Sequence, residues 1–166
     1  MLSVGYDYLK QLVCLCWQDV EYGLQHGYIA VDVAVRFCSD ELEMGRHLSH
    51  ELENMFLTTD ALEIVASVKI LADSERPIHP DDLRRKWHYV ILSWLYDHRQ
   101  ECRDPLGQVE SVYADFGYPS QIASFVRYMP MQGPDLGSEE KNEKRLMSRW
   151  YEYLLNEKQV FTVSPH

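Results

Sequence analysis

Apolar residues recur at steps of three and four along most of the chain, a spacing that places side chains on one face of a helix. The first such stripe consists of Tyr6, Leu9, Val13, Cys16 and Val20. Gly27 follows it, and glycine favours the left-handed conformation that often ends a helix. The pattern therefore predicts one helical stripe that stops at Gly27.

Residues typical of helix starts precede several later apolar stripes. Asp60 can cap a helix, and Glu63, three residues on, would complete a capping box. Pro80 suits a first helical turn because its missing N–H would have no intrahelical partner there. Asp104 and Pro105 give a second start signal of this kind, with proline in the first helical turn. A stripe before Asp60, made of Leu48, Leu52, Met55 and Phe56, predicts a further helix.

The segment after Pro80 carries the broadest apolar face, which comprises Leu83, Trp87, Val90, Ile91, Trp94 and Leu95. Shorter stripes follow, one in residues 105–116 and one between Pro119 and Pro130, and a last helix begins near Ser138. We therefore expect an all-α fold of seven or eight helices, packed irregularly around the Trp87–Leu95 helix. At this length a single domain over residues 1–166 is expected.

Residues 29–37 show a different pattern, because β-branched residues alternate with others at a period of two. A lone strand would have no partner in a helical chain, since even an isolated hairpin is marginally stable. We interpret this segment as helical. The alternative is a strand that pairs with the C-terminal tail at residues 160–163.

Charge is unevenly distributed along the chain, whose 16 basic and 26 acidic residues give a formal net charge of −10. Residues 19–63 hold ten acidic and two basic residues, a balance of −8. Such a segment repels nucleic acid and attracts a basic partner. The alternative is that the acidity only keeps the protein soluble. The basic cluster Arg84-Arg85-Lys86 follows two aspartates, and we interpret it as a solvated helix start.

The sequence also indicates where the protein resides. Its longest apolar run, residues 12–17, is far shorter than the roughly 20 residues that cross a bilayer. The first residues lack the positive charge of a secretory signal. We therefore expect a cytoplasmic protein with no membrane partner. The four cysteines have no zinc-site spacing and are expected to be buried free thiols; they are Cys14, Cys16, Cys38 and Cys102.

Established catalytic and nucleotide-binding motifs are missing from the sequence. The nearest approach to a site is the group His47, His50 and Glu51, which could bind a metal or serve acid–base chemistry on one helical face. The alternative is that these residues are neighbours by chance on a solvated helix face and share no function. We expect no cofactor and no catalysis, and a small metal-dependent enzyme is the alternative.

Two stretches resemble a bacterial family of uncharacterised helical proteins. The first runs from Asp104 to Pro119 and on through residues 125–130, and the second is residues 16–24 followed by 27–29. The similarity covers about residues 8 to 155. Members of this kind resemble immunity proteins, small acidic proteins that accompany secreted polymorphic or contact-dependent toxins. The resemblance implies a binding role without assigning any site residue.

The charge pattern and the resemblance indicate the same partner chemistry. Many such toxins are nucleases, whose active sites are basic because they hold phosphates. A carboxylate-rich surface could occupy such a cleft. We expect partner-binding residues at the end of one predicted helix and on the next, namely Asp40, Glu41, Glu43, Glu51 and Glu53. The alternative is an acidic interaction protein whose partner is not a toxin.

Overall fold

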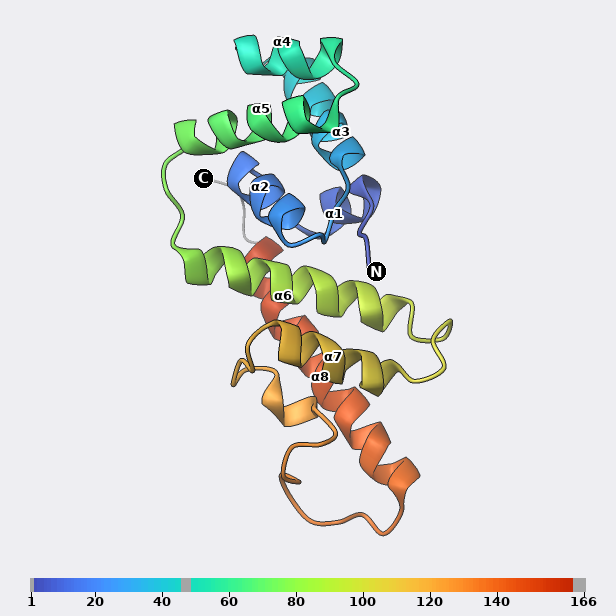
Figure 1. Ribbon diagram of the computed structural model, residues 1–166. Coiled ribbons are helices and arrows are strands. Elements are labelled where there is room, and N and C mark those ends of the chain that lie inside the picture. The colour runs from blue at the N-terminus through green and yellow to red at the C-terminus, as the bar shows by residue number, and fades with distance from the viewer. Residues whose placement is uncertain (1, 46–48, 163–166) are drawn as a thin grey trace. The chain divides into compact units, whose positions relative to one another are not determined.

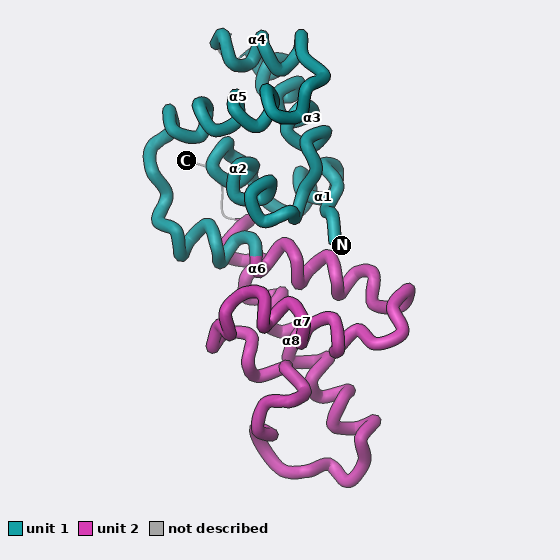
Figure 2. The backbone as a smooth tube through the Cα atoms, viewed as in Figure 1, with its two compact units in different colours: residues 1–87, 165–166 teal, residues 88–164 magenta. Residues whose placement is uncertain are grey.

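The structure, a computed structural model, describes residues 2–45 and 49–162. Within these ranges all regular structure is helical and comprises eight α-helices and one 3₁₀ turn (Figure 1). The predicted all-α class is confirmed. The chain divides into two compact units, which we call unit 1 (residues 1–87) and unit 2 (residues 88–164) (Figure 2). That residues 1–166 form one domain stays a prediction.

Unit 1 contains five complete helices: α1 (Tyr6–Leu12), α2 (Trp17–Gln25), α3 (Val31–Glu43), α4 (His50–Leu57) and α5 (Ala61–Ser74). The first residues of α6 (Pro80–Asp97) also belong to it. Helix α5 contacts α2, α3 and α4, and Figure 1 shows it between α2 and α4. The core of unit 1 therefore gathers along one side of α5, where Ile64, Val68 and Leu71 are buried.

The first predicted stripe is divided between α1 and α2, so the prediction of one continuous helical stripe is wrong. The backbone N–H of Cys16 donates to Asp19 at 3.0 Å. Glu75 accepts from the backbone N–H groups of Trp17 and Gln18, at 2.8 and 3.0 Å. These carboxylates satisfy N–H groups at a helix start, which have no intrahelical partner. Gly27 has a positive φ of 69° just after α2, as predicted.

The ambiguous segment is helical, because α3 covers Val31 to Glu43. Its buried positions include Val33, Ala34, Phe37 and Cys38, which share one helical face. The alternative of strand pairing is wrong for the described residues, since residues 160–162 belong to α8 (Glu139–Thr162). Val163 lies outside the described residues.

Caps at α5 and α7 follow the sequence prediction in part. Asp60 accepts from the backbone N–H of Leu62 at 2.9 Å. The capping box is wrong, because Glu63 accepts instead from the hydroxyl of Thr58. Thr58 in turn accepts from the backbone N–H of Asp60 at 3.1 Å. Asp104 caps α7 (Pro105–Asp115) by accepting from Gly107 at 3.1 Å.

Unit 2 consists of the rest of α6, then α7, the 3₁₀ turn η1 (Ala123–Phe125) and α8. The helix predicted between Pro119 and Pro130 is reduced to this turn, and Ile122, Phe125 and Val126 are buried without a longer helix. Trp150 is fully buried, with its ring centroid 5.1 Å from that of Tyr96 and 6.3 Å from that of Phe125. A loop of residues 126–138 connects η1 to α8.

Candidate functional site

Two of the five predicted partner-binding residues have structural partners. The Asp40 carboxylate accepts a hydrogen bond from Lys10 at 2.6 Å and one from the Tyr6 hydroxyl at 2.5 Å. The hydrogen bond from Lys10, and then that from Tyr6, holds the pKa of Asp40 below its ordinary value. Glu41 is buried, with 8% of its surface exposed. Asp40 therefore joins α3 to α1, and Glu41 faces the interior.

The other three predicted residues remain accessible. Glu43 and Glu53 are exposed, and Glu51 is half-buried. Together with Asp60 and Glu63 they are the acidic residues of the segment 43–63, and none of them makes an ion pair with another described residue. This segment therefore keeps much of the negative charge that the sequence indicated.

The buried ion pair between Asp19 and Lys86 removes another acid from the predicted surface. The two side chains are 2.7 Å apart, and their exposed fractions are 0% and 19%. The indole N–H of Trp87 donates to the backbone carbonyl of Asp19 at 3.1 Å. Lys86 is thus not part of a solvated helix start. It compensates a carboxylate inside unit 1.

Apolar side chains are exposed on and beside α4 and α5, which the sequence analysis missed. Five of them are more than half exposed: Met44, Phe56, Leu57, Leu62 and Ile70. Phe56 belongs to the apolar stripe that predicted this helix, yet it is 55% exposed. Its neighbours Leu52 and Met55 are buried, so the short helix α4 has its core face filled without Phe56. Met55 and Phe56 are both apolar and adjacent, so the sequence did not indicate which of the two would face solvent.

Grooves flank α5 on both sides. The first, of about 480 Å³, lies between α4 and α5 and is lined by residues that include Glu51, Leu57, Glu63 and Ile70. The second, of about 450 Å³, is formed by α2, the start of α3 and the other side of α5, with Leu62 and Val65 in its wall. Ala66 lines both grooves. Helix α5 is therefore a ridge between two depressions.

We call the exposed surface of α4 and α5, with Glu43 and Met44 beside it, the α4–α5 face. It combines exposed apolar side chains with carboxylates that have no ion-pair partner among the described residues. Contiguous exposed apolar surface is typical of interaction sites. A partner that presents apolar side chains with basic residues around them would be complementary to this face.

The structure does not group the residues of the alternative metal-dependent site, His47, His50 and Glu51, into a metal-binding arrangement among the described residues. His47 lies outside the described residues, while His50 is exposed and lines the groove between α4 and α5 together with Glu51. In residues 2–45 and 49–162, no three His, Cys, Asp or Glu side chains are grouped to hold a metal ion. The part of the chain that is described thus offers no preformed metal centre.

The cysteines are free thiols, as expected, but their burial differs. Cys38 is buried, whereas Cys14 is exposed, so the prediction that all four are buried is wrong. Burial, and then the nearby Asp19 carboxylate, raises the pKa of Cys16 to about 12. Burial raises the pKa of Cys38 to about 11. Both thiols are therefore poor nucleophiles, because the thiolate is the reactive form.

Among the described residues, no helix is both long enough and apolar enough to cross a membrane.

Comparison with known proteins identifies the family of the chain. A family model described as "Uncharacterized protein conserved in bacteria (DUF2247)" matches residues 6–158. No curated protein and no solved structure matches the chain. The predicted resemblance to an uncharacterised bacterial family is confirmed, and likeness to immunity proteins stays a prediction. The chain belongs to the bacterial family DUF2247.

Proposed function

We propose that the protein is an immunity protein that binds and neutralises a cognate secreted toxin, acting stoichiometrically through the α4–α5 face. One observation carries the proposal: α4 and α5 present large apolar side chains to solvent beside carboxylates without ion-pair partners among the described residues. The family resemblance described for the sequence is consistent with this role.

The apolar part of the face supports binding affinity. Leu57 and Leu62 are 86% and 80% exposed, and they stand at the adjoining ends of α4 and α5. Burying apolar surface against a partner contributes roughly 25 cal/mol for each Å². Phe56 and Ile70, which are 55% and 52% exposed, are further apolar side chains that α4 and α5 present to solvent. Both could act as anchors in the grooves and ridges of a protein partner.

The acidic part supports fast and specific association. Glu43, Glu51 and Glu53 remain in the proposed interface, whereas Asp40 and Glu41 do not, because both are engaged inside unit 1. Carboxylates around an apolar centre attract a basic partner and reject an acidic one. A nuclease toxin fits this chemistry, since its active site must hold phosphate groups.

The experiment is co-expression of the full chain with the toxin domain encoded beside its gene. We expect rescue of bacterial growth and a stable complex on size-exclusion chromatography. Failure of rescue would contradict the proposed neutralisation. A stable complex without rescue would do so as well, because it would show that the protein binds the toxin domain without neutralising it.

Variants of the face then locate the interface. The double charge reversal Glu51→Lys with Glu53→Lys should slow association at low salt by at least about tenfold and reduce its dependence on salt. Leu62→Asp should accelerate dissociation, because it places a charge in the apolar centre. The matched control is Asp81→Lys with Asp82→Lys, two exposed acids at the start of α6. Equal slowing by the control would remove the α4–α5 face from the proposal.

A further inference from the structure

A separate pocket lies within unit 2. It occupies about 520 Å³ between η1, the loop of residues 126–138 and the first turns of α8. The loop that forms its wall is the long irregular segment before α8 in Figure 1. Its volume is within the range of small-molecule sites, roughly 300 to 1,000 Å³. The proposed immunity function makes no use of it.

Two arginines from successive turns of α8 converge on this loop. Arg145 donates from Nη1 to the carbonyl of Pro134 at 2.7 Å. Arg149 donates from Nη2 to the carbonyl of Gln132 at 2.6 Å and from Nη1 to that of Ser124 at 3.3 Å. A Cβ atom placed on Gly133 would lie 3.4 Å from Nη1 of Arg145 and 3.9 Å from Nη2 of Arg149. Both guanidinium groups therefore lie against the same turn.

The charges of these two arginines are not neutralised by carboxylates within hydrogen-bonding distance. Neither forms an ion pair with a described residue. Each guanidinium carries five N–H donors, and the pair makes three hydrogen bonds. The Nε of Arg145 is buried and has no acceptor among the residues that the structure describes. A buried donor of this kind often has a water or an ion as its partner.

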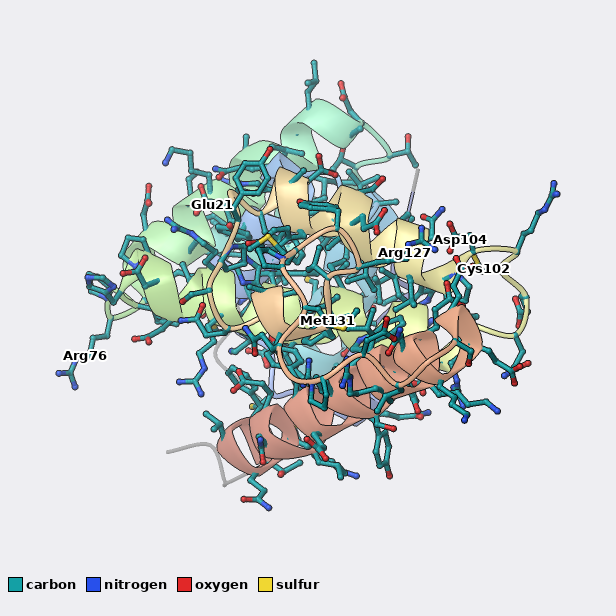
Figure 3. All side chains as sticks on the ribbon, turned by 90° about the horizontal axis from the view of Figure 1, so that it is seen from below. Glu21, Arg76, Cys102, Asp104, Arg127 and Met131 are labelled. Carbon is teal, nitrogen blue, oxygen red and sulfur yellow. The ribbon has the colours of Figure 1, made fainter. Side chains whose placement is uncertain are left out.

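The third arginine of the pocket is committed elsewhere. Arg127 contacts Asp104 and Glu110 at 3.0 Å each, and Glu143 at 3.4 Å. Figure 3 shows Arg127 beside Asp104. These three carboxylates satisfy its charge. Arg127 is therefore not available to a ligand in the way that Arg145 and Arg149 are.

The acidic residues of the pocket are also largely engaged. Glu143 pairs with Arg127. Asp135 accepts from the side-chain amide of Asn142 and the backbone N–H of Gly137, each at 2.9 Å. Of the described acidic lining residues, Glu139 alone has no hydrogen bond or ion pair to another described residue. The bonds to Asp135 come from uncharged amide groups, so its charge remains and opposes that of the nearby Arg145. Asp135 and Glu139 therefore balance the formal charges of Arg145 and Arg149. The unused N–H donors of the two guanidinium groups, and not a net positive charge, favour an anion here.

The rest of the lining is largely apolar and includes Ala123, Val126, Met129, Met131 and Leu146. Met131 is about half exposed, and Figure 3 labels it on the loop. A flexible methionine adapts to ligands of different shape. The pocket therefore combines charged donors with apolar lining residues.

We propose that this pocket binds a small molecule that carries a phosphate or carboxylate group on an apolar body. Arg145 and Arg149 donate hydrogen bonds to the oxygens of the anionic group, because the planar guanidinium fork matches both groups. The methionines and Leu146 contact the apolar body. Phosphate and carboxylate share this chemistry, and the experiment separates them.

The test is a titration of the full ¹⁵N-labelled chain followed by NMR. The probes are phenyl phosphate, phenylacetate, inorganic phosphate and benzyl alcohol, the last being the neutral control. We expect phenyl phosphate or phenylacetate to shift the amides of residues 123–137 and the Nε–H signal of Arg145. The tighter of the two identifies the anionic group. No shift from either at millimolar concentration would overturn the proposal, as would equal shifts from benzyl alcohol.

A matched pair of variants tests the arginine. Arg145→Gln should weaken binding at least about tenfold, since hydrogen bonds to charged groups are among the strong ones. Lys144→Gln removes the same charge from the adjacent residue of α8, whose side chain is exposed and does not line the pocket. The control should change the affinity by less than about twofold. Equal weakening by both variants would overturn the proposal in favour of non-specific attraction.

A third variant keeps both arginines and their bonds to the loop. Glu139→Gln removes a lining carboxylate that has no side-chain partner among the described residues, so it should tighten anion binding by about two- to threefold. Glu140→Gln is its control, because Glu140 is exposed and pairs with Lys144 outside the pocket. An unchanged affinity in Glu139→Gln would contradict the placement of the anion, whatever Arg145→Gln does to the loop.

Discussion

Units 1 and 2 hold eight basic residues each but use them differently. In unit 1, Lys10 and Lys86 neutralise carboxylates of other helices at 2.6 and 2.7 Å. In unit 2, Arg145 and Arg149 donate to backbone carbonyls, which carry no net charge. Unit 1 thus loses part of its apparent acidity, and unit 2 gains a pocket in which two guanidinium groups keep unused N–H donors. The surface field depends on which charges are paired, and a residue count does not report it.

The ion pair between Lys86 and Asp19 gives the largest expected effect. Lys86→Met would leave the fully buried Asp19 carboxylate without its partner, which should reduce the free energy of unfolding by about 3 kcal/mol. Guanidinium denaturation measures the loss. Hydrogen exchange should show weaker protection in peptides of residues 2–45 than in those of unit 2.

Lys69→Met is the control for this change. Lys69 is exposed and pairs with Asp73 at 3.4 Å, so its removal should reduce stability by less than about 1 kcal/mol. Similar losses in the two variants would show that burial of the Asp19 pair has no special weight. Equal loss of protection in both units would show that they unfold together.

A close contact in unit 1 gives the next effect. A Cβ on Gly23 would lie 2.5 Å from the ring of Trp87, which is 1% exposed. Gly23→Ala should therefore destabilise the protein by about 1–3 kcal/mol through overpacking. Thermal unfolding followed by tryptophan fluorescence measures it. Gly5→Ala is the control, since nothing lies within 4 Å of its Cβ position; equal effects would mean that the Trp87 contact is readily relieved.

The exposed network of unit 2 should contribute less. Arg127→Met removes the partner of Asp104, Glu110 and Glu143, but these side chains are 24–54% exposed. Solvent weakens such pairs, so we expect a loss of about 1 kcal/mol in urea denaturation. A loss as large as that of Lys86→Met would contradict the contrast between the two units.

The same variant should change the dependence of stability on pH. Arg127, and then the backbone N–H of Gly107, holds the pKa of Asp104 below its ordinary value of 3.8. A carboxyl group with a lowered pKa stabilises the fold above its unfolded pKa, and this stabilisation is lost as the pH falls through the folded pKa. Urea denaturation below pH 3.8 should therefore show a shallower loss in Arg127→Met than in the wild type. Identical slopes would contradict the role of Arg127.

Local signals explain how much of the fold could be predicted. Asp60, Pro80 and Asp104 mark helix starts because a cap depends on residues within one turn. The break before α2 could not be predicted, since the carboxylate that caps Trp17 comes from Glu75, 58 residues later. The exposure of Phe56 likewise depends on which face of α4 meets α5.

The candidate sites show the same limit. Charge counting selected Glu43, Glu51 and Glu53, which the structure leaves accessible. It also selected Asp40, whose partners Lys10 and Tyr6 are 30 and 34 residues away. The helical pattern predicted that the last helix begins near Ser138, but it gave Arg145 and Arg149 no role. The glycines and prolines of residues 130–137 are typical of a turn, but they do not indicate that its carbonyls meet two arginines.

The connection between α5 and α6 has a practical consequence for protein engineering. Its Arg-Pro composition suggests a good place to insert a tag or to open new chain ends. Gln18, however, donates to the carbonyl of Arg76 at 2.8 Å and accepts from the backbone N–H of Ile78 at 2.8 Å. An insertion here would break the hydrogen bonds between residues 76–78 and Gln18, and it would displace the Glu75 carboxylate that caps α2. Fusion partners belong elsewhere on the molecule.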